Sequence, residues 1–145
     1  MDGWCGVNPS KYVVGISDYW YVRPDNPTQL KAALNFVGPI SIAVGTWGTS
    51  KNIPFFSWFD YEGGIVDDYE ACPPGPNNGA PDHAALLVGY GTDEETGQEY
   101  WLIKNSFGSN WGEDGFIRIL IGPGKGVCGV NQSPVFATAI KPHMA

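Results

Sequence analysis

The chain has 145 residues, of which 43% are hydrophobic and 14% aromatic, enough for one domain with a buried core. Its formal net charge is −7 with only 8 Lys and Arg, and these cations do not cluster, which argues against nucleic acid as a partner. No apolar run approaches the roughly 18 residues of a membrane span, and no signal-peptide pattern opens the sequence. We expect one domain over residues 1–140 and a short tail over 141–145.

Turn-forming residues are frequent, with 20 Gly and 12 Pro, so the composition favours a loop-rich β protein. The first strand-like stretches are Lys11–Val14 and Trp20–Val22. A helix signal follows, because Asn26 can cap, Pro27 fits the first helical position, and Gln29 stands where a capping-box partner would. Apolar residues then recur at i, i+3, i+4 and i+7 until Gly38-Pro39 ends the run: Leu30, Ala33, Leu34 and Val37. This predicts one short amphipathic helix over about 27–37, packed on a sheet.

The middle of the chain alternates between short apolar runs and turn-rich connections. Ile40–Val44 reads as a buried strand, whereas Thr46–Tyr61 contains Pro54 and cannot be one regular strand. The aromatic residues of Thr46–Tyr61 are more often core than binding surface. The remaining expected elements are a turn at Gly63-Gly64, a short run at Ile65-Val66, a loop over Asp67–Pro81, a turn over Gly112–Gly115, a strand over Phe116–Ile121, a turn over Gly122–Gly126 and a last strand over Val135–Ile140.

The stretch from Asp82 to Trp111 carries the candidate chemistry. It consists of two strand-length apolar runs joined by the polar link Asp93–Gln98, which predicts an antiparallel pair. His83 opens the first run and Asn105 ends the second, so the imidazole and the carboxamide fall on the same rim of the sheet. The Asn105 oxygen would then accept the Nδ1–H of His83 and orient its ring, as a third group does in a nucleophilic site. Taken without context, such a pair is more often structural than catalytic.

The three cysteines are an odd number. Cys72 and Cys128 lie in loops that we expect at one end of the sheet, which predicts a disulfide between them worth about 4 kcal/mol. Such a bond indicates an oxidising compartment, and hence a lysosomal, vacuolar or secreted protein. Cys5 is left over, either as a buried free thiol or as half of a bridge to residues outside this chain.

Several segments together resemble the carboxyl-terminal half of a papain-like cysteine protease of the cathepsin L type. They read D-H-A-A-L-L-V-G-Y-G, Y-W-L-I-K-N-S-F-G-S-N-W-G-E-D-G-F-I-R-I and G-V-C-G-V, with weaker similarity in G-P-I-S-I-A-V and Y-E-G-G-I-V. The resemblance implies an α+β fold that is mostly antiparallel β, a twisted or barrel-like right lobe without the left lobe. In that family the left lobe carries the nucleophilic cysteine, and the right lobe carries the histidine and asparagine.

The resemblance also implies roles for single residues. His83 matches the general base, which forms a thiolate–imidazolium pair with the cysteine, and Asn105 matches the residue that orients it. Cys72 and Cys128 match the right-lobe disulfide, and Cys5 matches a cysteine bonded to the left lobe. Substrate-binding positions are implied at Ala43, Asp82, Ala84, Phe107, Trp111 and Ser133; among these, Trp111 lines the primed side, and the small residues Ala43, Ala84 and Ser133 form the pocket for the substrate's second residue.

Two departures from the family pattern bear on function. Phe107 stands where the family usually places the tryptophan that shields the Asn–His hydrogen bond, and the sequence has no C-G-[SA]-C-[WY] segment and no upstream glutamine for an oxyanion hole. We therefore expect no activity from this chain alone. The leading hypothesis is the right-lobe chain of a cysteine endopeptidase, which needs a left-lobe polypeptide with the nucleophile and acts on peptide or protein substrates.

Two alternatives remain, a non-catalytic structural or binding module and an inactive truncated lobe. A half-enzyme predicts an uncovered apolar face beside His83 and Asn105, whereas a stand-alone scaffold predicts a polar face or one covered by Thr46–Tyr61. The sequence shows no metal-ligand spacing and no phosphate-binding glycine loop, so we expect no metal and no cofactor. Nucleic-acid and membrane partners are not expected either.

Overall fold

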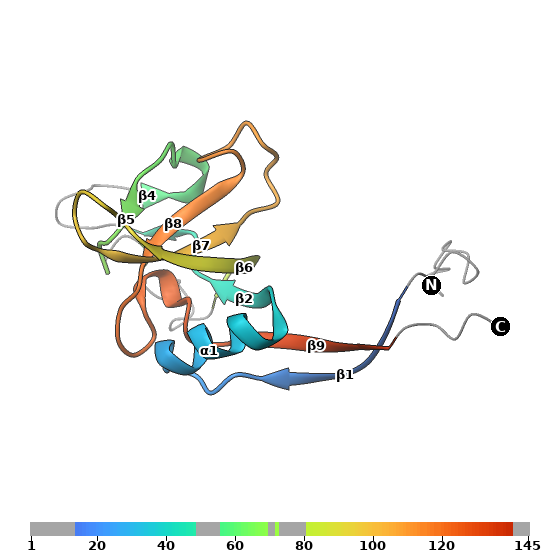
Figure 1. Cartoon of the computed structure of the whole chain (residues 1–145). Coiled ribbons are helices and arrows are strands. Elements are labelled where there is room, and N and C mark those ends of the chain that lie inside the picture. The colour runs from blue at the N-terminus through green and yellow to red at the C-terminus, as the bar shows by residue number, and fades with distance from the viewer. Residues whose placement is uncertain (1–13, 49–55, 70–71, 73–80, 141–145) are drawn as a thin grey trace.

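A seven-stranded, mostly antiparallel sheet forms the centre of the computed structural model, which describes residues 14–48, 56–69, 72 and 81–140. The strand order is β1-β9-β2-β6-β7-β8-β5, and only the β5–β8 pair is parallel (Figure 1). The strands are β1 (Gly15–Tyr21), β2 (Ile40–Val44), β5 (Ile65–Val66), β6 (His83–Thr92), β7 (Glu99–Lys104), β8 (Phe116–Leu120) and β9 (Val135–Ile140). The α+β class, with an antiparallel sheet and one short helix, is confirmed.

The core lies on one face of the central strands, where apolar and exposed positions alternate. β2 and β8 place every second residue inside, because successive side chains of a strand point to opposite faces. The largest fully buried side chains are Trp58, Trp101, Leu30, Ile40, Ile42, Leu87, Ile103, Ile117, Ile119, Val44, Val127 and Val130. The period-2 pattern of the sequence therefore identified the strands that carry this core.

The α-helix α1 (Pro27–Val37) forms where its capping signals predict it. The Asn26 side chain accepts a hydrogen bond from the Gln29 backbone N–H at 3.0 Å, and the Gly38 N–H donates to the Leu34 carbonyl. Leu30 and Leu34 are buried. The exposed side of the helix reaches the far end of β6 and β7, where the Lys31 ammonium lies 2.6 Å from a Glu99 carboxylate oxygen. No helix in the described ranges is long and apolar enough to cross a membrane.

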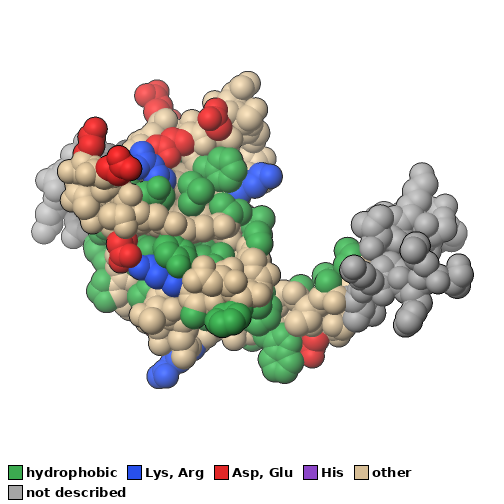
Figure 2. All heavy atoms as spheres, viewed as in Figure 1, with side chains coloured by type: hydrophobic (Ala, Val, Ile, Leu, Met, Phe, Trp, Pro, Cys, Tyr) green, Lys and Arg blue, Asp and Glu red, His purple; other side chains and the backbone are tan. Residues whose placement is uncertain are grey.

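The expected strand Trp20–Val22 was wrong in its bounds, and the expected strand Lys11–Val14 lies outside the described residues except for Val14. The strand β1 runs over Gly15–Tyr21 and pairs with β9, and the two form a ribbon that extends away from the body (Figure 1). The register shifts between Ile16 and Asp18, so one extra residue interrupts the pairing. β1 is exposed along almost its whole length, which removes the alternation that sequence reasoning depends on. Hydrophobic side chains are exposed along this ribbon, while Asp and Glu gather over the end that carries β4 and β5 (Figure 2).

As expected, the aromatic segment Thr46–Tyr61 is not one regular strand. It contains the short strands β3 (Trp47–Gly48) and β4 (Phe56–Ser57), which pair with each other, and the 3-10 helix η2 (Trp58–Asp60). Trp58 is fully buried and Tyr61 is buried, whereas Phe59 is 72% exposed. The expectation that these aromatics form core is thus confirmed for two of them and wrong for Phe59.

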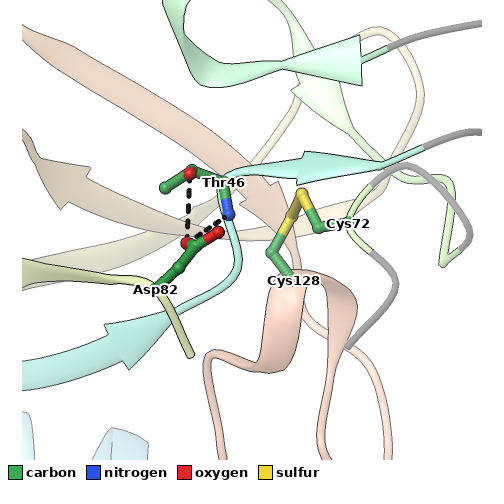
Figure 3. The surroundings of a disulfide bond; sticks show 4 residues. All are labelled: Thr46, Cys72, Asp82 and Cys128. Atoms are coloured by element: carbon green, nitrogen blue, oxygen red, sulfur yellow. Dashed lines mark hydrogen bonds between the residues drawn. A yellow bond between two sulfur atoms is a disulfide. The ribbon is translucent and has the colours of Figure 1, made fainter. Parts of the chain in front are cut away.

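The disulfide between Cys72 and Cys128 is present and lies at the end of the sheet where β6 begins (Figure 3). Their Cα atoms are 4.6 Å apart, and both residues are buried. Cys128 belongs to the 3-10 helix η3 (Val127–Gly129), and its carbonyl accepts a hydrogen bond from the Gly45 N–H at 2.9 Å. The disulfide therefore connects the loop before β6 to the segment that holds the end of β2. Cys5 and the tail 141–145 lie outside the described residues.

Candidate active site

The sheet brings His83 and Asn105 together, as the pairing of the two runs predicts. β6 begins at His83, and β7 ends at Lys104, one residue before Asn105. The two strands are antiparallel, with Leu86 opposite Lys104, and the link between them closes with a hydrogen bond from the Asp93 N–H to the Gln98 carbonyl. The start of one strand and the end of the other therefore share one rim of the sheet.

The hydrogen bond between the two side chains joins His83 Nε2 and Asn105 Oδ1 at 2.9 Å. Asn105 Oδ1 also lies 2.8 Å from the Ser106 backbone N–H. A backbone N–H can only donate, so the carboxamide atom at this position must be its oxygen. Oδ1 cannot donate, so His83 must donate from Nε2.

This arrangement corrects the prediction that Nδ1 faces the asparagine. With Nε2 protonated, the neutral imidazole carries its free lone pair on Nδ1, and Nδ1 is the nitrogen that can accept a proton. A group that gives a proton to this imidazole would therefore approach from the Nδ1 side. Sequence reasoning placed the two residues on one rim but had no information on the orientation of the ring.

Backbone contacts fix Asn105 itself. Its N–H donates to the Gly115 carbonyl at 3.0 Å, and only 7% of the residue is exposed. Gly115 has a φ of 92°, a conformation that glycine adopts without strain. Among the described residues no acceptor pairs with Asn105 Nδ2, although this atom is buried. The carboxamide is thus held by the hydrogen bonds at its oxygen.

Two aromatic rings contact the partly buried imidazole. Trp58 contacts His83 edge to face with ring centroids 5.7 Å apart, and Phe107 lies at 5.4 Å from the same ring. Phe107 also meets Trp111 at 5.4 Å, and the Trp111 Nε1–H donates to the Trp58 carbonyl at 2.5 Å. Phe107, in the place of the tryptophan that the family usually has, therefore contacts the His83 ring of the His83–Asn105 pair. Apolar rings around a hydrogen bond exclude water and strengthen its electrostatic component.

A network of charged side chains around Arg118 holds the turn that follows Trp111. Arg118 binds both carboxylate oxygens of Glu113 through Nε and Nη2, at 2.7 to 3.1 Å, and binds Asp93 through Nη1 at 3.0 Å. The Glu113 Oε1 accepts the Gly64 N–H, and the Tyr61 hydroxyl donates to the Gly64 carbonyl. The network thus ties the aromatic segment, the β6–β7 link and β8 to one another.

The network also shifts the pKa values of its members. Hydrogen bonds from Arg118 are the largest cause that lowers the pKa of Glu113, and hydrogen bonds from Thr96 are the largest cause that lowers the pKa of Asp93. Hydrogen bonding to Glu113 raises the pKa of Arg118, and burial raises the pKa of Tyr61. Both carboxylates are therefore ionised near neutral pH and the phenol is neutral.

The three small residues expected in a substrate pocket come from β2, from β6 and from the bend before β9. Ala43 on β2 lies directly opposite Ala84 on β6. Ser41 on β2 pairs with Val135 on the antiparallel strand β9. Ala43 comes two residues after Ser41, and Ser133 comes two residues before Val135. The same register, continued, therefore brings Ser133 to the level of Ala43. An open hollow of about 410 Å³ borders Ala84 and Asn105, and its lining is Ser41, Ala84, Ala85, Leu86, Lys104, Asn105 and Ser106.

The remaining residues expected to bind substrate have different surroundings. Asp82 Oδ1 accepts hydrogen bonds from the Thr46 N–H and the Thr46 hydroxyl, both at 3.0 Å, so this carboxylate connects the end of β2 to the start of β6 (Figure 3). Trp111 is 9% exposed and lines a second open hollow of about 480 Å³ with Phe59, Asp60, Tyr61, Glu62, Asn110 and Gly112. Phe107 contacts both Phe59, which lines this hollow, and His83.

The described residues contain no free thiol. Cys72 and Cys128 are bonded to each other, and Cys5 lies outside the described part of the chain. No group of three or more His, Cys, Asp or Glu in the described ranges is arranged to hold a metal ion.

Sequence reasoning missed four contributors to the site: the Ser106 N–H, Trp58, Phe59 and the Arg118 network. The only signal for Trp58 and Phe59 was the density of aromatics in Thr46–Tyr61, and it does not say which ring faces the histidine. Arg118 stands in an alternating strand pattern, which predicts an outward side chain but not its acidic partners.

Comparison with known proteins agrees with this geometry. A model of the papain family of cysteine proteases matches residues 2–138. A cathepsin L-like protein of Caenorhabditis elegans is 42% identical over 114 residues, which are 76% of this chain and 29% of the relative. Fruit bromelain of Ananas comosus is 32% identical over 138 residues, covering 94% of this chain and 34% of the relative.

Solved structures give the same result. Digestive procathepsin L 3 from the larval midgut of Tenebrio molitor superposes with a TM-score of 0.72 at 29% identity, covering 93% of this chain and 39% of that structure. The chain thus spans about a third of the length of the relatives that it matches, and its sheet and helix correspond to the right lobe of their fold. The chain belongs to the papain family of cysteine proteases.

Proposed function

We propose that this chain is the histidine- and asparagine-bearing lobe of a cysteine endopeptidase, and that the nucleophilic cysteine belongs to a left lobe outside this sequence. The observation that carries the proposal is the 2.9 Å bond from His83 Nε2 to Asn105 Oδ1, with the oxygen's identity set by the Ser106 N–H. This bond leaves Nδ1 of His83 free to take the proton of a cysteine thiol.

The proposed chemistry has two steps. His83 accepts the thiol proton at Nδ1, the thiolate attacks the peptide carbonyl, and the imidazolium returns the proton to the leaving amine. The neutral imidazole then takes a proton from water as the water oxygen attacks the carbonyl of the acyl-enzyme. The bond from carbon to sulfur breaks, and the imidazolium returns the proton to the sulfur, which regenerates the thiol. Asn105 stabilises the imidazolium by accepting its Nε2–H throughout.

The surface beside the pair supports a missing lobe rather than a stand-alone scaffold. Ala84 and Leu86 are exposed on the face that carries the 410 Å³ hollow, and the described part of Thr46–Tyr61 packs instead around the rings of His83 and Phe107. The face next to the base is therefore apolar in part and uncovered by the described residues, as a half-enzyme requires.

Substrate recognition and location follow as parts of the same proposal. Ala43, Ala84 and Ser133 leave room for a bulky apolar side chain at the second position of a peptide substrate, and Asp82, Phe107 and Trp111 flank the same rim. The disulfide of Cys72 and Cys128 supports an oxidising compartment, lysosomal, vacuolar or extracellular. Cys5 would bond to the left lobe.

A lobe exchange tests the proposal. The right lobe of the Tenebrio procathepsin L 3 is replaced by residues 2–138 of this chain, and hydrolysis of a fluorogenic peptide is measured after activation. We expect hydrolysis that His83→Ala abolishes. The matched control is His143→Ala in a chimaera extended to residue 145, because His143 is the chain's other histidine. A folded chimaera that takes an epoxide probe on its cysteine but does not hydrolyse peptides would contradict the proposal.

A further inference from the structure

One aromatic residue of the site has an exposed ring in a fixed place. Phe59 is 72% exposed, yet its ring stacks on Phe107 with centroids 4.9 Å apart and an interplanar angle of 8°. Because most of its surface remains exposed to solvent, the Phe59 side chain contributes little hydrophobic stabilisation. The stacking on Phe107 is a ring contact that holds this exposed side chain against the site.

The backbone around Phe59 holds the ring in this position. The Phe59 N–H donates to the Ser57 hydroxyl at 3.1 Å, and the Trp58 N–H donates to the Thr46 carbonyl at 2.8 Å. The Trp58 carbonyl in turn accepts the Trp111 Nε1–H and the Tyr61 N–H. Hydrogen bonds thus hold η2 on both sides of Phe59, and the exposed ring directly follows the fully buried residue Trp58.

Phe107 alone is a smaller cover than the tryptophan that usually follows Asn-Ser in this family. Its ring contacts His83 at 5.4 Å with an interplanar angle of 41° and stacks on Phe59 at 4.9 Å, so Phe59 covers one face of Phe107. A half-buried phenyl ring without a neighbour on its outer side can rotate away and admit water. Phe59 removes that freedom.

We infer that Phe59 is a positioning residue that acts through Phe107: the two stacked rings form one cover that keeps water from the His83–Asn105 hydrogen bond. The importance of this cover for catalysis rests on the function proposed above. Its effect on the hydrogen bond does not, and is measurable in this chain without a nucleophile.

The test measures solvent exchange of the His83 Nε2 proton by ¹⁵N NMR in the 145-residue chain. Phe59→Ala should raise the exchange rate about two- to tenfold, the range expected for loss of one aromatic pair. Phe36→Ala is the matched control, because Phe36 is 89% exposed on α1 and should leave the rate unchanged. Phe59→Tyr should restore the wild-type rate, since it keeps the stacking ring.

Backbone amide exchange at Ile103, in the core of β7, separates a local effect from a loss of stability. We expect Phe59→Ala to leave the Ile103 rate unchanged. An unchanged His83 rate in Phe59→Ala would overturn the inference, as would an equal rise at Ile103 or a failure of Phe59→Tyr to restore protection. The failure of the proposed function would appear in the lobe exchange and not in these rates.

Discussion

Replacing Asn105 by Ala tests the geometry on which the site depends. Asn105 Oδ1 accepts two hydrogen bonds, from His83 Nε2 at 2.9 Å and from the Ser106 N–H at 2.8 Å, and the residue is almost fully buried. A hydrogen bond of this kind contributes about 1 kcal/mol, so its loss should lower the ratio of the Nε2–H to the Nδ1–H tautomer of His83 about fivefold. Ser106 is exposed, so water can replace the lost partner of its N–H, and the loss of this second hydrogen bond should lower the free energy of unfolding by about 1 kcal/mol.

The assay reads both effects on the same samples. ¹⁵N NMR of the imidazole gives the tautomer ratio, and urea unfolding gives the free energy of unfolding. Asn131→Ala is the control, because Asn131 is 1% exposed and its Nδ2 donates to the carbonyls of Gly122 at 3.0 Å and Gly124 at 2.9 Å. It should destabilise the fold and leave the His83 tautomer unchanged. A wild-type ratio in Asn105→Ala, or an equal change in Asn131→Ala, would refute the reasoning.

Three further predictions follow from other parts of the structure. Replacing both Cys72 and Cys128 by Ser should lower the free energy of unfolding by about 4 kcal/mol, because the bond closes a loop with a sequence separation of 56; an unchanged urea midpoint would contradict this. The pKa of Glu113 is lowered in the folded state, so its contribution to stability is present above its ordinary value of 4.5 and is lost as pH falls through the lower folded value. The urea midpoint should therefore fall as the pH is lowered from about 5, and Glu113→Gln should weaken this dependence, with Asp93 retaining part of it; a slope equal to that of the wild type would count against the network. In the lobe exchange, Ala84→Phe should lower kcat/KM about tenfold for peptides with a bulky apolar second residue and much less for those with a small one, and an equal loss for both would show that Ala84 does not line the pocket.

The sequence allowed the central part of the fold and of the site to be predicted. The alternation in Ile40–Val44 marked β2 as a buried strand, and the cap at Asn26 with Pro27 placed the start of α1. His83 and Asn105 could be paired because the short link Asp93–Gln98 predicts antiparallel strands, so that the start of the first strand meets the end of the second. These features depend on local spacing, which a single sequence contains.

The missed features depend on three-dimensional orientation. The choice of Nε2 over Nδ1 is set by a ring rotation, and the stacking of Phe59 on Phe107 joins residues 48 positions apart through η2. β1 was misplaced because its pairing with β9 is made by backbone groups while its side chains face solvent, so no periodic pattern marks it. Backbone pairing and ring orientation leave little trace in the order of residue types.

The central claim is that this chain supplies a base to a cysteine on another lobe, and the protein isolated from its source tests it most directly. Non-reducing mass spectrometry, with and without an epoxide probe for reactive cysteines, shows what is bonded to Cys5 and which thiol reacts. We expect a Cys5 disulfide to a left-lobe sequence whose cysteine takes the probe. A chain that occurs alone, or a partner without a reactive cysteine, would contradict it.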